Sequence, residues 1–391
     1  MNHRRISIGA PVSNQDAEGN CEAPWISNDS SSSLNKYEAS AYVDKLWTEL
    51  QERELSTRQT ELQDCSLTIN DKTIRWNECI YSRRRPPTGH SLWISMHGGG
   101  GCPAPVNDEQ YENQIHLYDP SEGIWVVPRS PTDSWNQWHQ DHIDPMFNRI
   151  IENYIMIHGI NPNRVYILGY SAGGDGVYQL APRMADRFAA ASMMAGHPND
   201  ASPLGLRNLP FAIFVGENDD GYDRNKVARQ WSEQLDALQA SDPDGYHHYV
   251  NICKNMGHWM CGQDAEALNW MSQWTRKPWP KKVVWVQDDV IHQQFYWLAL
   301  PDNVQGKQGQ KIVAEVDGQT IRISTSEDIR DLVLCLSDVL IDLDQPIDVR
   351  VENHGQVFEG FVPRTKQAIE KSLQARADPT LVSTAQLTLH W

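Results

Sequence analysis

The fold of this chain is decided by the stretch RVYILGYSAGG, residues 164–174. Apolar residues over 165–168 predict a buried strand, and Val177, Leu180, Ala181 and Met184 follow at helical spacing. The Gly-x-Ser-x-Gly pentapeptide 169–173 lies between the two. A sharp turn from strand to helix lifts a serine hydroxyl above the edge of a sheet. We therefore interpret Ser171 as a candidate nucleophile.

Short apolar runs alternate with helical patterns on both sides of this stretch. Strands are predicted at 66–69, 73–76, 92–96, 124–127, 189–194, 211–215 and 248–252, and helices at 37–55, 146–157 and 227–238. Such alternation predicts a mostly parallel sheet covered by helices on both faces. We expect this α/β domain to span residues 36–280, including the first helix and strands.

The two ends of the chain have a different texture. Residues 1–35 are rich in Ser, Asn, Asp and Gly and predict a flexible tail. The run KPWPKK, residues 277–282, resembles a domain joint. Downstream, short strands are predicted at 283–286, 294–298, 311–316, 320–323 and 348–351, with one helix at 365–376. We expect residues 281–391 to form a small β-rich, sandwich-like domain.

Composition excludes several classes of protein. The chain has 391 residues and a formal net charge of −17, so it repels phosphate backbones, and we expect no nucleic-acid partner. The seven cysteines never occur as CxxC, which favours neither a disulfide framework nor a thiolate zinc site. No run of about 20 apolar residues predicts a membrane span. We expect a cytoplasmic protein.

A serine nucleophile needs a base, and the base needs an orienting acid. His258 follows the strand predicted at 248–252, which is the position of the base in this architecture. His97, His139, His142 and His197 fit this position less well. Of four carboxylates after the strand at 211–215, we favour Asp219 and keep Asp220 as the alternative; Glu217 and Asp223 complete the set. The order Ser, Asp, His along the chain is typical of this architecture.

A glycine run supplies the next candidate element. His97 and four glycines, 98–101, follow the strand predicted at 92–96. Glycines allow backbone N–H groups to face a developing oxyanion without obstruction by side chains. We expect the N–H of Gly99, or else of Gly100, to form an oxyanion hole with the N–H of Ala172. A phosphate-binding loop is disfavoured because neither GK[ST] nor GxGxxG is present.

The segment 135–144 is rich in tryptophan, histidine and aspartate. Its two histidines and two aspartates raise a metal site as an alternative, but a helix start capped by Asp141 or Asp144 is the simpler interpretation. The segment follows a strand by one loop, which places it near the mouth of the site. We expect five residues to line a substrate cleft: Trp135, Trp138, His139, Tyr170 and Trp259.

In combination these motifs resemble the α/β-hydrolase superfamily, especially its polyhydroxybutyrate-depolymerase and feruloyl-esterase-like branch. The resemblance rests on HGGGG (97–101), PNRVY (162–166), GYSAGG (169–174), Gly-x-x-Asp (216–219) and GHW (257–259), and covers about residues 60–280. It implies a Ser-His-Asp hydrolase of small carboxylic esters with an acyl-enzyme intermediate and no metal or cofactor. The alternatives are a prolyl-oligopeptidase-like peptidase and a non-catalytic binding protein on the same fold. The C-terminal domain could mediate a homo-oligomer.

Overall fold

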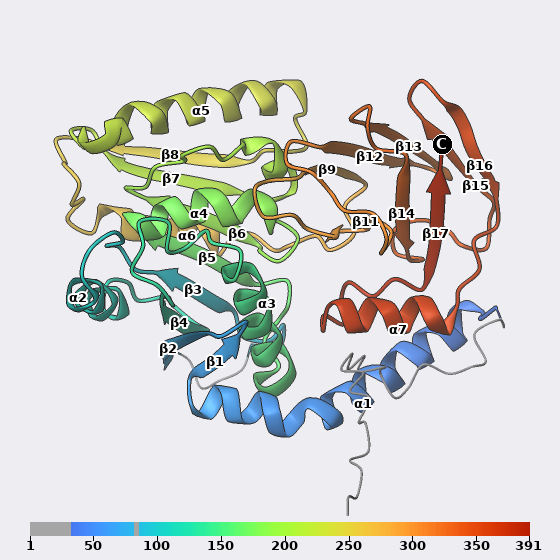
Figure 1. Ribbon diagram of the computed structural model, residues 1–391, viewed down its shortest axis with the longest axis horizontal. Coiled ribbons are helices and arrows are strands. Elements are labelled where there is room, and N and C mark those ends of the chain that lie inside the picture. The colour runs from blue at the N-terminus through green and yellow to red at the C-terminus, as the bar shows by residue number, and fades with distance from the viewer. Residues whose placement is uncertain (1–32, 82–85) are drawn as a thin grey trace, which may run out of the picture.

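The computed structural model describes residues 33–81 and 86–391 (Figure 1). The tail predicted over residues 1–35 lies outside the described residues except for its last three. Of these, Leu34 forms an isolated bridge with Arg364. Asn35 caps helix α1 (Lys36–Gln63) by accepting hydrogen bonds from the N–H groups of Tyr37 and Glu38. Leu34 and Asn35 are therefore part of the folded structure.

An eight-stranded sheet forms the centre of the first part of the chain, in the order β1-β2-β4-β3-β5-β6-β7-β8. The first strands pair antiparallel up to the β2–β4 pair, and all later pairs are parallel. The strands are β1 (Ser66–Ile69), β2 (Lys72–Ile80), β3 (Leu92–Met96), β4 (Ile124–Arg129), β5 (Val165–Tyr170), β6 (Ala190–Met194), β7 (Phe211–Gly216) and β8 (His248–Cys253). The predicted parallel α/β architecture is confirmed.

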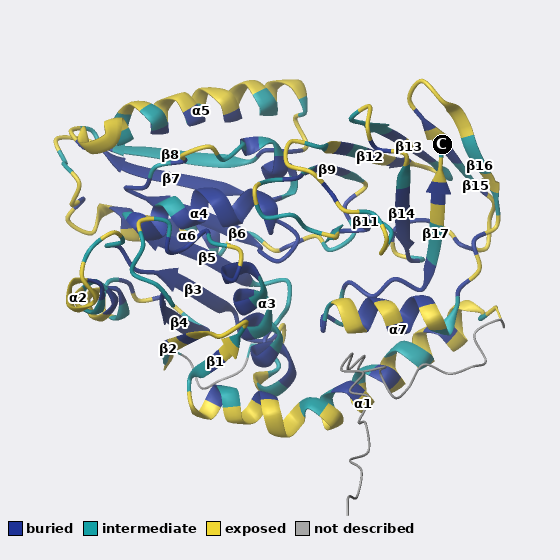
Figure 2. Cartoon of the chain, viewed as in Figure 1, coloured by how far each residue is buried: buried dark blue, intermediate teal, exposed yellow. Residues whose placement is uncertain are grey.

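Two hydrophobic clusters cover the two faces of this sheet. Ile94 and Ile167 belong to one cluster, whereas their neighbours Trp93 and Leu168 belong to the other, as the alternation of side chains along a strand requires. Helices α3 (Ile143–Asn153), α4 (Ala172–Arg183) and α5 (Arg224–Ser241) contribute to the first cluster. Helices α2 (Ala104–Ile115) and α6 (Glu266–Met271) contribute to the second. Figure 2 shows the central strands buried and the outer side of α5 exposed.

The C-terminal part contains two further sheets and one helix, α7 (Lys366–Ala375). The five-stranded sheet has the order β16-β15-β13-β12-β9, and the four-stranded sheet has the order β10-β11-β14-β17. The strands are β9 (Lys282–Val286), β10 (Gln294–Phe295), β11 (Leu298–Ala299), β12 (Lys311–Asp317), β13 (Thr320–Thr325), β14 (Asp331–Leu336), β15 (Ile347–Val351), β16 (Gly355–Gly360) and β17 (Ala385–His390). The prediction of one strand over 294–298 is wrong, because Tyr296 takes a left-handed φ of 51° and turns the chain between β10 and β11.

Helix α1 lies along both parts of the chain (Figure 1). Near its start, Ala39 and Leu46 pack with Ile369 and Leu373 of α7. Near its end, Arg58 donates a hydrogen bond to the side chain of Asn153 in α3 at 3.0 Å. The helix that the sequence placed within the first domain thus also supports the second. No helix in the described residues combines the length and the apolar character that crossing a bilayer requires.

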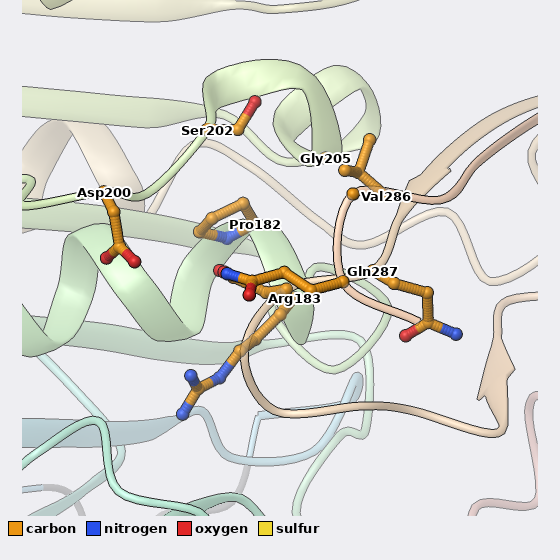
Figure 3. Close-up of a pocket in the computed structure, with 10 residues that line it drawn as sticks. Pro182, Arg183, Asp200, Ser202, Gly205, Val286 and Gln287 are labelled. Atoms are coloured by element: carbon orange, nitrogen blue, oxygen red, sulfur yellow. The ribbon is translucent and has the colours of Figure 1, made fainter. Parts of the chain in front are cut away.

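A cavity of about 140 Å³ lies where the two parts meet (Figure 3). Pro182 and Arg183 of α4 line it from one part, and Gln287, directly after β9, lines it from the other. Ser202 also lines it, but its hydroxyl accepts a hydrogen bond from the N–H of Leu204 and caps a short helical turn. No histidine is among the described residues that line this cavity. We assign it to the packing of the joint.

Candidate active site

Ser171 occupies a strained turn between β5 and α4. Its φ of 58° and ψ of −120° are unfavourable for a residue with a side chain, and such strain is concentrated at functional sites. A Cβ on Gly169 would lie 2.3 Å from the carbonyl oxygen of Gly173. A Cβ on Gly173 would lie 2.1 Å from the carbonyl oxygen of Met96. The glycines on either side of Ser171 are therefore required for the turn to pack against β3.

The structure brings Ser171, His258 and Asp219 together. The His258 Nε2 atom lies 3.0 Å from the Ser171 Oγ, and its Nδ1 atom lies 2.9 Å from the Asp219 Oδ2. His258 follows β8 and Asp219 follows β7, so adjacent parallel strands deliver both to the same edge of the sheet. Asp219 is 2% exposed, whereas Asp220, the alternative acid, is exposed. An Nδ1–H donated to Asp219 leaves the Nε2 lone pair facing the serine.

Tyr170 supports the histidine loop. Its hydroxyl donates a hydrogen bond to the carbonyl oxygen of His258 and accepts one from the N–H of Met260 at 3.2 Å. Trp259, which is 54% exposed, packs on the Tyr170 ring at 5.7 Å between centroids. Neither aromatic residue is among those that line the cavity at Ser171. Their contacts favour a role in holding His258 over the lining role predicted from the sequence.

His97 anchors the glycine run. Its Nδ1–H donates to the carbonyl oxygen of Gly98 at 2.6 Å, and its Nε2 accepts from the N–H of Ser130 at 3.2 Å. Burial lowers the pKa of His97 to about 4, so the ring is neutral near pH 7. A neutral imidazole is what this pair of bonds requires, because one ring nitrogen donates and the other accepts. His97 is thus engaged in positioning the loop.

Asn107, in the first turn of α2, distinguishes the two candidate oxyanion donors, the N–H groups of Gly99 and Gly100. Its side chain is fully buried, and its Oδ1 accepts a hydrogen bond from the N–H of Gly100 at 2.8 Å. Its Nδ2 donates to the Asp133 carboxylate at 2.8 Å. Among the described residues, none accepts a hydrogen bond from the N–H of Gly99 or of Ala172. The geometry therefore favours Gly99 over Gly100.

Replacing Asn107 with alanine is expected to disturb this loop. The Gly100 N–H and the Asp133 carboxylate would lose a buried partner, which costs about 1–3 kcal/mol of stability. We expect kcat for an ester to fall by about tenfold to a hundredfold with little change in KM, because misplaced oxyanion donors act on the transition state. Steady-state kinetics and thermal unfolding of Asn107→Ala measure the two effects. A rise in KM at unchanged kcat would contradict the role of Asn107 in positioning the donors.

A cavity of about 360 Å³ opens at Ser171. It is lined by Gly99, Gly100, Trp135, Ser171, Ala172, Asp175, His197, Asn199, Tyr222 and Arg224. Of the five residues predicted to line a cleft, only Trp135 is among them. Trp138 is fully buried and its Nε1 donates to the carbonyl oxygen of His97 at 2.8 Å. His139 is buried beside the Trp135 ring.

Several of these lining residues were missed from the sequence. His197 and Asn199 follow β6, and Tyr222 and Arg224 come from the turn into α5, so no local pattern marks them. Asp175 had a usable signal, because it lies one helical turn after Ser171 and therefore on the same face of α4. Its carboxylate accepts a hydrogen bond from the N–H of His197 at 2.6 Å. Burial raises the pKa of Asp175 to about 6.

Helix α3 begins at Ile143, so the segment 139–144 is a helix start as predicted, but His142 rather than either aspartate occupies the N-cap. Asp144 does not cap α3; its carboxylate is buried and accepts hydrogen bonds from Arg183 of α4 at 2.6 and 2.9 Å. The ring of His292, from the C-terminal part, lies 2.7 Å from the same carboxylate. Asp141 is exposed. Asp144 therefore joins α3, α4 and the second part of the chain.

The order of the central sheet, the strained serine after β5, and the aspartate and histidine that follow β7 and β8 define the α/β-hydrolase fold. The predicted fold class is confirmed, and the further β-rich segment follows it along the chain. No family model and no curated protein sequence matches the chain.

Solved structures of several esterases are similar to this chain. A thermostable esterase has 17% identity over 54% of this chain and 62% of its own, with a TM-score of 0.41. A ferulic acid esterase has 16% identity, covering 53% of this chain and 96% of its own, with a TM-score of 0.38. The poly(3-hydroxybutyrate) depolymerase LpqC from Bordetella parapertussis has 16% identity, covering 52% of this chain and 89% of its own, with a TM-score of 0.39. The match thus spans less than two thirds of the thermostable esterase.

Proposed function

We propose that this protein is a serine hydrolase of carboxylic esters. The observation that carries the proposal is the unbroken chain of contacts from the Ser171 Oγ through both ring nitrogens of His258 to the Asp219 carboxylate, at 3.0 and 2.9 Å. A serine hydroxyl is a weak nucleophile unless a base removes its proton. Here the base lies within hydrogen-bond distance and its tautomer is set by a buried acid.

The reaction follows from these positions. Ser171 attacks the ester carbonyl carbon while His258 Nε2 takes the hydroxyl proton. The N–H groups of Gly99 and Ala172 stabilise the oxyanion of the tetrahedral intermediate, and each such donor lowers the barrier by about 3 kcal/mol. The C–O bond to the alcohol then breaks as His258 returns the proton to the leaving oxygen. Water, activated by His258, repeats the sequence on the acyl-enzyme and releases the acid.

The lining of the cavity supports an ester as the substrate. Gly99, Gly100 and Ala172 leave the approach to Ser171 open, and Trp135 offers an exposed aromatic side chain at its edge. Ser171 is itself only half-buried and lines the open cavity, so a small substrate can reach it. Small carboxylic esters therefore fit the site.

A fluorophosphonate probe tests the nucleophile directly. We expect the probe to label the wild-type protein on Ser171 and to leave Ser171→Ala unlabelled. Ser202→Ala serves as the matched control, because its hydroxyl lies in the other cavity and caps a helical turn. A panel of acyl esters and short peptide amides then separates an esterase from a peptidase. Labelling of Ser171→Ala at the wild-type rate would overturn the proposal.

A further inference from the structure

The cavity at Ser171 is lined mainly by glycine, alanine, polar and aromatic residues. None of the described residues that line it is Val, Leu, Ile, Met or Phe, and Arg224 is its only Lys or Arg side chain. An alkyl chain gains binding energy by contact with apolar surface, which here is limited to small residues and to the rings of Trp135 and Tyr222. The chemistry of the lining thus favours a polar group on the substrate.

Arg224 is held in place from one side. Its guanidinium lies 4.9 Å from the centroid of the Tyr222 ring, and its Nη1 donates to the carbonyl oxygen of Gly221 at 3.2 Å. The same Nη1 lies 3.4 Å from the Oδ1 of Asp219. The other carboxylate oxygen of Asp219, Oδ2, contacts His258. The side chain is 13% exposed. These contacts fix the plane of the guanidinium before any substrate arrives.

The opposite edge of the guanidinium is unpaired. The Arg224 Nε is buried and has no hydrogen-bond partner among the described residues, and none of them accepts from Nη2. A buried donor without an acceptor is unfavourable, and covering it with an alkyl group leaves it unpaired. Nε and Nη2 form the fork that matches the two oxygens of a carboxylate.

We infer that Arg224 binds a carboxylate of the substrate, so that the ester hydrolysed at Ser171 carries an anionic group. This inference rests on the proposed esterase function and specifies its substrate class. The group would lie on either the acyl or the alcohol side of the ester, since Arg224 and Ser171 line one cavity.

The carboxylate of Asp175 would repel an anionic substrate bound at Arg224. It lines the same cavity, and Arg224, His197 and His258 all favour its ionised form. A substrate carboxylate on Arg224 would reduce that support, and burial already raises the pKa of Asp175 to about 6. Removing the charge with Asp175→Asn should therefore improve the use of an anionic ester relative to a neutral one.

The test compares esters of matched length that differ in charge. Monoethyl glutarate carries a carboxylate on the acyl side, pentanoyl glycolate carries one on the alcohol side, and ethyl pentanoate is neutral. We expect wild type to hydrolyse one of the anionic esters with a kcat/KM about tenfold above that for ethyl pentanoate. Arg224→Gln should abolish this preference, mainly through KM, and Asp175→Asn should increase it.

Arg229→Gln is the matched control, because Arg229 is an exposed arginine of the same helix and does not line the cavity. It changes the net charge equally and should keep the wild-type preference. Equal loss of activity by Arg224→Gln on all three esters would overturn the inference, since Arg224 would then act only through Asp219. A wild type that prefers ethyl pentanoate would overturn it too, while leaving the esterase function intact. Failure of wild type on every ester would instead remove the proposed function.

Discussion

Replacing Ser171 with alanine is expected to lower kcat for a carboxylic ester by about a million-fold, as loss of the nucleophile does in a comparable triad. The fold should survive, because the hydroxyl hydrogen-bonds to His258 alone among the residues that the structure describes. Stopped-flow or pH-stat assays of ester hydrolysis measure the change. Unfolding temperature provides the control for structural integrity.

The other two members of the proposed triad, His258 and Asp219, provide the comparison. His258→Ala should lose about as much activity as Ser171→Ala, and the double variant should lose little more, because residues that act as one unit are not additive. Asp219→Asn should lower kcat by about ten-thousand-fold by favouring the wrong tautomer of His258. Additive losses in the double variant would contradict a shared proton-transfer chain.

Replacing Arg276 with methionine is expected to destabilise the protein by about 3–5 kcal/mol, the usual cost of breaking a buried ion pair. Arg276 is almost fully buried and donates to Asp378 at 2.6 Å and to the side chain of Asn163 at 2.9 and 3.0 Å. It also donates to the carbonyl oxygen of Asp186 at 2.6 Å. The substitution leaves the Asp378 carboxylate buried opposite an apolar side chain. Urea unfolding measures the loss.

The pH dependence of this loss provides its control. Burial alone would raise the pKa of Asp378, but the guanidinium groups of Arg276 and Arg187 lower it to about 2. The ion pair therefore stabilises the wild type above about pH 4, the unfolded-state value, and this contribution disappears as the pH falls through 2. The difference in free energy of unfolding between wild type and Arg276→Met should therefore decrease as the pH is lowered from about 4 to about 2. Lys371→Met, which removes an exposed pair with Asp302, should cost less than about 1 kcal/mol.

Much of the fold was accessible from the sequence because its signals are local. The strand at 92–96, the glycine run after it and the turn at Ser171 each follow from neighbouring residues, and the structure has them at the predicted positions. Strands β14, β16 and β17 were missed. Strands β14 and β17 pair with each other although they lie far apart in the chain, whereas β16 pairs with β15 directly before it. At Tyr296 the opposite occurred: the apolar pattern predicts one strand over 294–298, but the left-handed backbone of Tyr296 divides it into two.

The position of Trp138 illustrates what the sequence leaves open at the site. Its place in a tryptophan-rich loop after β4 predicted a residue of the cleft. In the structure, Trp138 packs closely against Gly176 of α4. A Cβ at position 176 would lie only 2.5 Å from the Cβ of Trp138, so this packing requires the glycine. The indole therefore packs into the core and donates to the backbone of His97. The cleft residues that replace it come from loops after β6 and β7.

The sequence by itself determined the α/β-hydrolase architecture and identified Ser171, His258 and Asp219 as candidate catalytic residues. It could do so because strands and turns are predicted from short segments of neighbouring residues. Only the tertiary structure decided that the Gly100 N–H is paired with Asn107, and that Asp144 and Arg276 join the two parts of the chain. It also decided that Arg224, whose Nε is unpaired among the described residues, lines the same cavity as Ser171. The physical reason is that hydrogen-bond saturation and burial depend on partners far apart in the chain. Those partners carry no periodic signal of their own.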